Sequence, residues 1–479
     1  MTTMVRGKTE TATAVTRPVQ KIPELPFIGS LPGFNRDRLG FLLGLSRAGG
    51  DVARFHFGPF PAYFFNTPEL IQAVMVDHPQ DFDGGPVRHN AFGPVIGNGL
   101  FNSEGELHRR QRKIMAPAFQ PRHIKTYADT IVGYGEQMQA AWEDGAVVDV
   151  SHEMTNLTMS IIGKVLFDAD VVTEADDLGA AVTTVLGHIS YVFSSLYPIP
   201  ISWPLPRHRR TRKAIAFLRA GIQDMIDERR NSPVERDDFL SILLRSRDDD
   251  GNPMSDEQVI DEAMTFFGAG HETTANGLTW AWYLLSTHPD AYARLRAEVD
   301  TVLRGRSPTY EDLPRLPYAQ RVFKESLRLY PPAYIFSRFA LRDVEVGGYP
   351  IRKGETVVMS PYSMHRRPDL FASPERFDPD RFTPEREAAL PRHAYMPFGA
   401  GPRICIGNHF ALMEGHLLLA TLAQRATFDL APGQEVVPAP QVTTRPRDGI
   451  QMIVRRREDL GSRAGESVSH QHSSHTTPS

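Results

Sequence analysis

The chain has 479 residues, a formal net charge of −4 and 41% hydrophobic residues. This composition is that of a globular protein with a large core, and the small charge gives no electrostatic reason to expect a nucleic-acid partner. The single cysteine, Cys405, excludes internal disulfides, which suits a reducing compartment and predicts a cytoplasmic protein.

The two ends of the chain differ in character from the rest. Residues 1–20 carry charge and threonine but no apolar stretch, so they lack the pattern of a secretory signal. We expect residues 1–20 and the low-complexity residues 458–479 to be disordered tails. Because no run of about eighteen apolar residues occurs, no membrane anchor is predicted. Residues 21–457 are expected to form one large domain.

The predicted strands lie near the start and in the last third of this domain. From Asp51, DVARFHFG alternates apolar and polar residues as a half-buried strand does, and PFPAYFFN is a candidate hairpin partner. The segment PELIQAVMVDH that follows has a helical pattern. Further short strands are expected at VEVGGYPI, ETVVMS and GIQMIVRR.

Between these strands, apolar residues recur mainly at helical spacing. The predicted helices cover residues 131–142, 157–166, 180–196, 209–230, 255–286, 290–303 and 318–329. The longest begins with Ser255 followed by Gln258, which matches a capping box in a turn that also carries Asp256 and Glu257. The predicted fold class is therefore mainly α with a smaller β region (α+β).

The segment SLYPIPISWPLP, residues 195–206, connects two of these helices. Its prolines interrupt an otherwise apolar stretch, so it cannot form one regular helix. It is either a loop packed on the surface or a mobile hydrophobic lid over a pocket, and the sequence leaves both possibilities open.

The residues around Cys405 form a glycine-rich loop, FGAGPRICIG, which is followed by the helical pattern NHFALMEGHLLLATLAQ. The backbone N–H groups of such a loop and the helix N-terminus are expected to lower the pKa of the thiol. A lone cysteine is otherwise a small buried hydrophobe or, with a histidine base, a nucleophile. The bulky Phe398 and Ile404 and the small Gly407 favour instead a sulfur shielded from water beneath a flat cofactor.

A second motif, AGHETT at residues 269–274, lies inside the longest predicted helix. Glycine costs about 1 kcal/mol relative to alanine in a helix interior, so its presence needs a reason. Small residues there let either a flat ligand or a neighbouring helix approach the backbone. Thr273 can bond back to the carbonyl of Ala269 or release it and bend the helix. An acid and a hydroxyl beside such a distortion can pass protons to bound dioxygen.

The Cys405 loop resembles the haem-ligand loop of the cytochrome P450 superfamily, F-x-x-G-x-R-x-C-x-G, and AGHETT resembles its A/G-G-x-D/E-T-T/S motif. The resemblance covers residues 21–457 and is to the bacterial type of soluble haem-thiolate monooxygenase. It implies haem b, iron protoporphyrin IX, with the Cys405 thiolate as axial ligand of the iron. It also implies that Glu272 and Thr273 are the acid–alcohol pair that delivers protons. His271 occupies the variable position and receives no role.

The same resemblance implies how the haem propionates are bound. Arg403, two residues before the cysteine, is expected to pair with one of them. His108 and Arg112 lie one helical turn apart, and although a basic helix face is usually solvated charge, similar H-x-x-x-R segments of the family reach the propionates. Arg338, expected just before a strand, matches a third propionate-binding position.

Glu325 and Arg328, at i and i+3 of one predicted helix, resemble the structural E-x-x-R motif of the family. By spacing alone they are equally a surface ion pair. Their partner is expected in FDPDRF, which makes it Arg381. The string PERF at Pro374–Phe377 lies one motif too early.

The function implied is a monooxygenase that inserts one oxygen atom of O2 into a lipophilic small molecule, such as a terpenoid, fatty acyl chain or polyketide-like ring, by hydroxylation or epoxidation. Candidates for lining an apolar pocket are residues 92–101, Phe266, Phe267, Ala269 and residues 333–336, all of which could equally be core residues. The segment after Cys405 leaves no room for a fused flavin reductase, so a ferredoxin and its NAD(P)H-dependent reductase are the expected electron donors.

Arg109, Arg110 and Lys113 are candidates for docking an acidic donor of this kind. Two rival functions stay open: a haem-thiolate peroxygenase or isomerase that needs no reductase, and a haem-binding sensor without turnover. The Glu272–Thr273 pair argues against the first.

Overall fold

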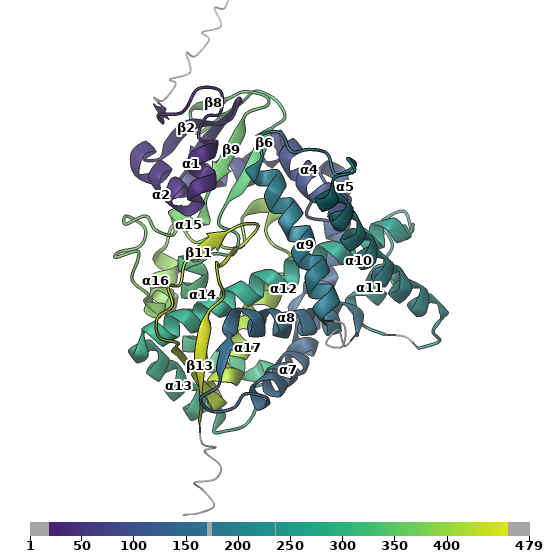
Figure 1. Cartoon of the computed structure of the whole chain (residues 1–479), viewed down its shortest axis with the longest axis vertical. Coiled ribbons are helices and arrows are strands. Elements are labelled where there is room, and N and C mark those ends of the chain that lie inside the picture. Colours follow the sequence, from purple (N-terminus) through teal and green to yellow (C-terminus); the bar gives the residue numbers. More distant parts are fainter. Residues whose placement is uncertain (1–18, 170–174, 235, 458–479) are drawn as a thin grey trace, which may run out of the picture.

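A computed structural model of the chain describes residues 19–169, 175–234 and 236–457. The predicted tails lie outside these residues, except that the first strand begins at Gln20. Helices make up the larger part of the molecule, and the largest sheet lies at one end of it, at the top of Figure 1. The predicted class, mainly α with a smaller β region, is confirmed.

The largest sheet contains six strands in the order β1-β2-β3-β9-β6-β4, and three smaller sheets pair β10-β13-β5, β11-β12 and β7-β8. The predicted hairpin is confirmed, since Val52 lies opposite Phe65 and Phe57 opposite Phe60 in antiparallel register. The strands are β1 (Gln20–Lys21), β2 (Val52–Phe57), β3 (Phe60–Phe65), β4 (Phe82–Asp83), β5 (Val147–Asp149), β6 (Phe336–Ala340), β7 (Val344–Val346), β8 (Tyr349–Ile351), β9 (Thr356–Met359), β10 (Ala426–Leu430), β11 (Pro438–Pro440), β12 (Thr444–Pro446) and β13 (Gln451–Arg456).

All seven predicted helices are present, as α7, α8, α9, α10, α12, α13 and α14, and the helix after Cys405 is α17. Sequence periodicity missed α1, α2, α4 and α11; α4, for example, contains Pro94. The α-helices are α1 (Leu31–Arg36), α2 (Arg38–Gly49), α3 (Pro68–Gln72), α4 (Gly85–Ile96), α5 (Gly105–Met115), α6 (Pro121–Ile124), α7 (Ala128–Ala140), α8 (Val150–Phe167), α9 (Ala175–Ser194), α10 (Pro206–Asn231), α11 (Phe239–Arg245), α12 (Asp256–Thr287), α13 (Pro289–Leu303), α14 (Pro317–Leu329), α15 (Pro361–Met364), α16 (Pro384–Ala389) and α17 (Asn408–Arg425). Short helical turns are η1 (Ala73–Asp77), η2 (Pro79–Asp81), η3 (Ala116–Phe119), η4 (Lys125–Tyr127), η6 (Tyr310–Arg315), η7 (Pro379–Phe382) and η8 (Gly401–Arg403).

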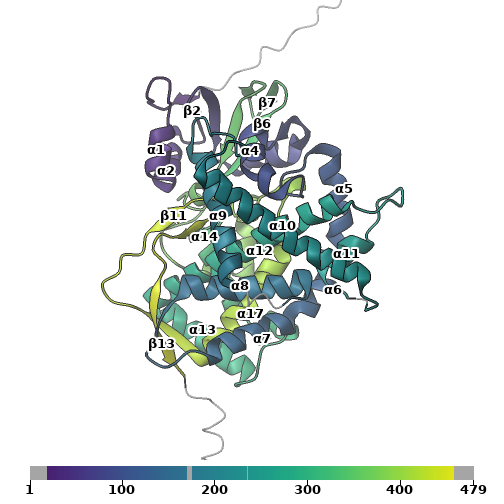
Figure 2. The same cartoon turned by 45° about the vertical axis from the view of Figure 1, so that its right-hand side comes forward.

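Helix α12 runs through the middle of the helical part, and α9 and α10 pass over it (Figure 2). Half of the predicted capping box is present: the Ser255 hydroxyl oxygen accepts the N–H of Gln258 at 3.2 Å, whereas the Gln258 side chain donates to Glu262 at 2.9 Å instead of returning to Ser255. Among the described residues, no helix is both long and apolar enough to cross a membrane. The proline-rich segment between α9 and α10 lies at the surface, with Tyr197 and Trp203 exposed, a position that both of its predicted possibilities share.

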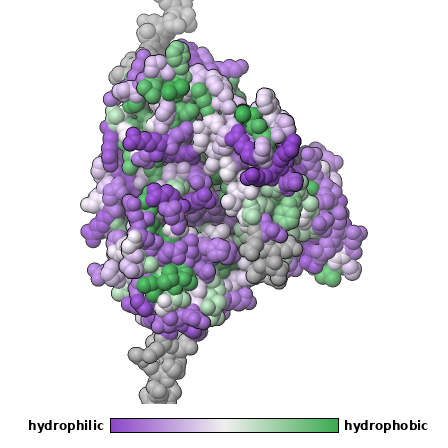
Figure 3. All heavy atoms as spheres, in the orientation of Figure 1, coloured by the Kyte–Doolittle hydropathy of each residue, from purple (hydrophilic) through white to green (hydrophobic). Residues whose placement is uncertain are grey.

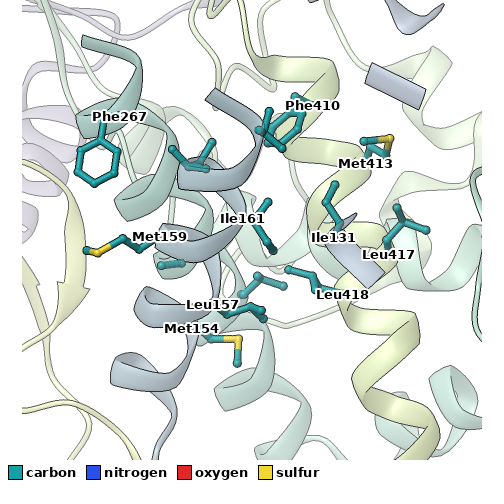
Figure 4. Packing of buried hydrophobic residues seen from close by; sticks show 14 of the residues in the cluster. Ile131, Met154, Leu157, Met159, Ile161, Phe267, Phe410, Met413, Leu417 and Leu418 are labelled. Atoms are coloured by element: carbon teal, nitrogen blue, oxygen red, sulfur yellow. The ribbon is translucent and has the colours of Figure 1, made fainter. Parts of the chain in front are cut away.

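Four helices share the apolar core that fixes α12 relative to α17 (Figure 4). Ile161 of α8, Ile131 of α7 and Leu417 and Leu418 of α17 have no exposed surface, and Phe267 joins them from α12. Full burial of each such side chain contributes about 1.5–3 kcal/mol. This packing holds the helix that follows Cys405 at a set distance from the helix that carries the AGHETT motif.

A buried ion network joins α14 to η7. Arg328 donates to both carboxylate oxygens of Glu325, at 2.6 and 2.8 Å, and neither residue has exposed surface. Arg381 completes the predicted trio, with its Nε 3.3 Å from Glu325 Oε1. Arg376, from the string PERF, contributes only its carbonyl oxygen, which accepts from Arg328 at 3.1 Å.

Candidate active site

Cys405 lies between η8 and α17 in a loop that backbone contacts hold closed. Its N–H donates to the Phe398 carbonyl at 2.9 Å, and the Ile404 N–H donates to Gly401 at 3.0 Å. Gly401 has a φ of 66°, and a Cβ added to it would lie 1.9 Å from the carbonyl oxygen of Met75 in η1. A left-handed φ and so close an approach both require glycine. The loop therefore fixes Cys405 through its backbone.

The Cys405 thiol is enclosed by protein, yet the residue keeps accessible surface. Burial raises its pKa, while the Gly407 N–H and the Arg112 guanidinium oppose the rise. The expectation of a lowered pKa is therefore wrong for the polypeptide alone, because burial outweighs the loop and the nearby charge. Accessible surface on a residue whose thiol is surrounded by protein indicates an internal space beside the loop. A coordinated metal ion would remove the thiol proton outright.

The middle of α12 is open on one side. Gly268 and Ala269 are exposed, whereas residues 259–267 before them are buried. A Cβ on Gly268 would meet nothing within 4 Å, while one on Gly270 would lie 2.7 Å from Cδ1 of Ile162 in α8. Both interpretations of the small residues therefore hold, for different positions. Gly270 permits a helix–helix contact, and Gly268 with Ala269 leaves room for a flat group.

The acid and alcohol of the AGHETT motif are held differently. The Thr273 hydroxyl donates to the Ala269 carbonyl at 2.7 Å, as the sequence suggests. The Glu272 carboxylate accepts the hydroxyl of Thr443 at 2.8 Å, and the Asn276 amide donates to Thr443 at 3.0 Å. Thr443 lies in the turn between β11 and β12. The sequence analysis did not identify it, because it belongs to no recognisable motif. His271 is buried and packed, with a ring nitrogen 2.7 Å from the Phe267 carbonyl.

Five basic side chains meet beside the Cys405 loop. They are Arg88 of α4, His108 and Arg112 of α5, Arg338 of β6 and Arg403 of η8. Four were predicted from the sequence and Arg88 was missed. Arg338 lies within a strand rather than just before one. The Glu104 carboxylate forms ion pairs with both Arg88 and Arg403, so Arg403 has a protein partner here. The Arg112 guanidinium donates to the Ile404 carbonyl at 2.8 Å.

These side chains oppose one another's charge. Burial, then repulsion by Arg403, lowers the pKa of Arg88 to about 9, that of Arg338 to about 10 and that of His108 to about 3. Burial lowers the pKa of Arg403 to about 10 as well, against the attraction of Asp83. At pH 7 Arg88, Arg338 and Arg403 are therefore charged and His108 is neutral. Arg112 is charged as well, because a guanidinium group in a protein does not lose its proton at this pH.

The charge balance of this cluster calls for an anion. In the described structure, two carboxylates, Glu104 and Asp83, compensate two of the four arginines in this cluster. Two positive charges remain uncompensated. Buried charges of this kind need partners. Haem carries two propionates, which match the two uncompensated positive charges. The Cys405 residue and the open stretch of α12 offer a ligand and space for its flat ring. When bound, haem supplies the iron that activates dioxygen.

The three predicted docking cations all face solvent, but two already have partners. Arg110 is 2.8 Å from Asp248, and Lys113 is 2.7 Å from Asp249. Arg109 is exposed and forms no ion pair among the described residues. A surface groove of about 350 Å³ lies here, lined by His108, Arg109, Arg112, Lys113, Ala116 and Pro402. It places these basic residues next to the Cys405 loop.

Comparisons with known proteins agree with this geometry. Cyclooctatin synthase from Streptomyces melanosporofaciens is 41% identical over 428 residues, covering 88% of this chain and 92% of that protein. Pentalenene oxygenase from Streptomyces avermitilis is 37% identical over 88% of this chain and 93% of that protein. Cyclooctat-9-en-7-ol 5-monooxygenase, also from S. melanosporofaciens, is 37% identical over 85% of this chain and 89% of that protein.

Among solved structures, the cytochrome P450DA heme domain superposes with a TM-score of 0.84 at 28% sequence identity, covering 93% of this chain and 99% of that one. The sequence profile of cytochrome P450 matches residues 19–454. The fold, the Cys405 loop and these matches together show that the chain belongs to the cytochrome P450 family and is a haem-thiolate monooxygenase.

Proposed function

We propose that this monooxygenase oxidises a terpenoid, using haem b bound through Cys405 and electrons from a ferredoxin and its NAD(P)H-dependent reductase in the cytoplasm. The observation that carries the haem assignment is the single cysteine, held in a closed loop with accessible surface beside two uncompensated positive charges. The substrate class rests on the similarity to one synthase and two oxygenases that are named for terpenoid compounds, cyclooctatin, pentalenene and cyclooctat-9-en-7-ol.

An apolar substrate also suits the aromatic side chains within the predicted lining. Phe92 of α4 has its ring centroid 4.8 Å from that of Phe101 and 5.9 Å from that of Phe193 in α9. Phe101 keeps 47% of its surface exposed. A cluster of this type offers apolar contact area and no hydrogen bonds. This suits a hydrocarbon ring system, which has no groups that form hydrogen bonds.

We assign the proton steps to Glu272 and Thr273. Thr273 must release the Ala269 carbonyl before its hydroxyl can donate to another acceptor. Glu272 keeps one carboxylate oxygen on Thr443 and has its other oxygen for passing a proton. We assign the propionates to His108, Arg112, Arg338 and Arg403, and we add Arg88 because Glu104 pairs with both Arg88 and Arg403.

The role of Thr273 is tested by Thr273→Ala, which should keep haem but divert reducing equivalents to hydrogen peroxide. Thr279→Ala is the matched control, because Thr279 makes the same bond to the carbonyl four residues earlier, at 2.8 Å, on the same helix. NADPH consumption, product and peroxide are measured together. Undiminished coupling in Thr273→Ala would refute the proton role.

The ligand assignment is tested by Cys405→Ser, which should abolish the red-shifted absorbance of the reduced carbon-monoxide complex. A retained band would refute it. Product formation that proceeds unchanged without reductant would instead support a peroxygenase or isomerase.

The ferredoxin proposal rests on the basic groove beside Cys405. Arg109→Glu should raise the ferredoxin concentration needed for half-maximal turnover, with the difference shrinking as salt rises. Arg122→Glu, an exposed arginine on α6 outside this groove, is the control. Equal effects of the two substitutions would place the donor elsewhere.

A further inference from the structure

The Glu272 carboxylate is held by a segment far from it in the sequence. The Thr443 hydroxyl donates to it at 2.8 Å from the turn between β11 and β12, 171 positions along the chain. Asn276 lies one helical turn after Glu272 on α12, and its amide donates to the same Thr443 oxygen at 3.0 Å. Thr443 therefore bridges two positions on one face of α12.

The donors fix the direction of these two hydrogen bonds. The Asn276 amide nitrogen can only donate, so the Thr443 oxygen accepts from it and has its single proton for Glu272. The other carboxylate oxygen of Glu272 forms no hydrogen bond among the described residues. One oxygen of Glu272 is thus held in place, and the other is available to a proton.

The turn that carries Thr443 is itself fixed by buried donors. The Arg38 guanidinium of α2 is 8% exposed and donates to the carbonyls of Pro440 and Gln441, both at 3.1 Å. The Tyr334 hydroxyl also donates to the Gln441 carbonyl, at 3.0 Å. Because these carbonyls are bonded to donors from other segments, the peptide groups that precede Thr443 cannot turn freely.

The chain after Thr443 is fastened to α12 as well. The Trp280 indole donates to the Thr444 carbonyl at 3.0 Å, and the Thr444 N–H donates to Pro332 at 3.0 Å. Thr443 is 6% exposed and Thr444 is fully buried, whereas Gln441 at the tip is exposed. Figure 3 shows mostly hydrophilic side chains over the middle of the molecule, where β11 lies in Figure 1. The turn reaches inwards from this surface to α12.

We propose that Thr443 is a positioning residue for Glu272, which it holds in the orientation from which the second carboxylate oxygen passes protons. Thr443 acts through Glu272 and donates to no other group among the described residues. The bond from Trp280 to Thr444 already joins the hairpin to α12, so the Thr443 hydroxyl is not needed for that purpose. The proposal rests on the proton role assigned to Glu272 under the proposed function.

The first test is the hydrogen peroxide formed per NADPH oxidised by the holoenzyme with ferredoxin and reductase. This measurement needs no identified substrate, because reducing equivalents that are not recovered as peroxide have gone to water or product. Thr443→Val removes the hydroxyl and keeps the branched side chain. We expect the ratio of peroxide to water plus product to rise about tenfold, the factor that one hydrogen bond to a charged group contributes. Thr443→Ser keeps a hydroxyl and should restore the wild-type ratio.

Thr444→Val is the matched control. Thr444 is the next residue in the chain, and its hydroxyl is buried without a hydrogen-bond partner in the described structure. The control should therefore give the wild-type ratio. Equal peroxide from Thr443→Val and Thr444→Val would overturn the proposal, since any loss of a hydroxyl in this hairpin would then explain the result. A high ratio that persists in Thr443→Ser would overturn it too.

A double-mutant cycle shows whether Thr443 acts through Glu272. Glu272→Gln keeps an acceptor for Thr443 but has no proton to exchange at that carboxyl, so it should raise peroxide by itself. Adding Thr443→Val to Glu272→Gln should change the ratio by at most about twofold, because the two residues act as one unit. A further tenfold rise would contradict the proposal. A wild-type ratio in Glu272→Gln would refute the proton role itself, whereas a wild-type ratio in Thr443→Val alone would refute only the positioning.

The solvent isotope effect separates slower proton delivery from a disturbed structure. NADPH oxidation is measured in H2O and in D2O, and the carbon-monoxide difference spectrum checks the haem site of each variant. Thr443→Val should show a larger isotope effect than the wild type and than Thr444→Val, because proton transfer then limits the rate more strongly. A lower rate with an unchanged isotope effect would mean that Thr443 is only structural.

Discussion

The molecule contains two clusters of buried charge that are arranged in opposite ways. In the network of Glu325, Arg328 and Arg381, every charged group faces a partner within the chain, and Arg328 makes hydrogen bonds to Glu325 and to the carbonyls of His365 and Pro374. In the cluster around Arg403, four arginines share two carboxylates and lower one another's pKa. A network whose charged groups are all hydrogen-bonded within the chain stabilises the fold, whereas a cluster with uncompensated charge is prepared for a ligand.

The largest effect is expected from breaking the network of Glu325, Arg328 and Arg381. Arg328→Met leaves Glu325 buried without its bidentate partner and should lower the free energy of unfolding by about 3–5 kcal/mol. Urea denaturation measures this change. Arg294→Gln is the control, because Arg294 also pairs bidentately, with Asp380, but with 54% of its side chain exposed, and should cost at most about 1 kcal/mol. Equal costs would erase the distinction between buried and exposed pairs.

Removing a cation from the other cluster should weaken ligand binding and leave the fold intact. Arg338→Gln relieves repulsion, so the haem-free protein should be no less stable than the wild type. Loss of a charge-assisted hydrogen bond of about 1.5–3 kcal/mol should weaken haem binding tenfold to a hundredfold. Transfer of haem to a haem-free globin measures this. A haem-free variant as unstable as Arg328→Met would show that Arg338 is structural.

Acid should distinguish the clusters through one histidine in each. Burial lowers the pKa of His108 and of His365 to about 3. The unfolded value is about 6.5, so the folded state binds fewer protons between these limits. Stability is therefore complete above about pH 6.5 and falls as the pH drops towards 3. Propionates beside His108 would raise the pKa of its imidazole. Bound haem should therefore reduce the part of the acid-induced loss of stability that comes from His108.

The measurement compares unfolding at pH 7 and pH 5, with and without haem, in the wild type, His108→Asn and His365→Asn. His365 should respond alike in both states, because its ring bonds only to backbone, at the Arg328 carbonyl and the Met396 N–H. A haem-dependent change that persists in His108→Asn would have to come from another group.

The smallest effect is expected at the exposed pair of Lys113 and Asp249. Their side chains are 70% and 78% exposed, so water screens the attraction. Lys113→Gln should leave the thermal melting curve of the holoenzyme unchanged. A resolved decrease in Tm would mean that this ion pair stabilises the contact between α5 and the loop before α12.

The sequence predicted features that depend on local pattern. Helical periodicity located seven helices. The glycines around Cys405 indicated a closed loop, and the structure shows why one of them is needed: the close contact with Met75 leaves no room for a side chain at Gly401. The Glu325–Arg328–Arg381 trio also followed from motif spacing.

Features that depend on distant segments were not accessible in this way. Thr443 reaches Glu272 across 171 residues, and Arg88 joins the other arginines only because Glu104 bridges it to Arg403. The pairing of Arg110 and Lys113 with the acidic loop before α12 also depends on the tertiary fold. The direction of the Cys405 pKa was wrong because burial, which a local sequence does not reveal, outweighs the loop dipoles.

The solitary thiol has a practical consequence for work on this enzyme. Because Cys405 is the only cysteine, a thiol reagent has one target in the native sequence, and iron ligation removes that target. Maleimide uptake therefore counts the molecules in a preparation that have lost their cofactor. The fully loaded enzyme is in effect cysteine-free, so a cysteine introduced at any exposed position accepts a single dye or spin label without background.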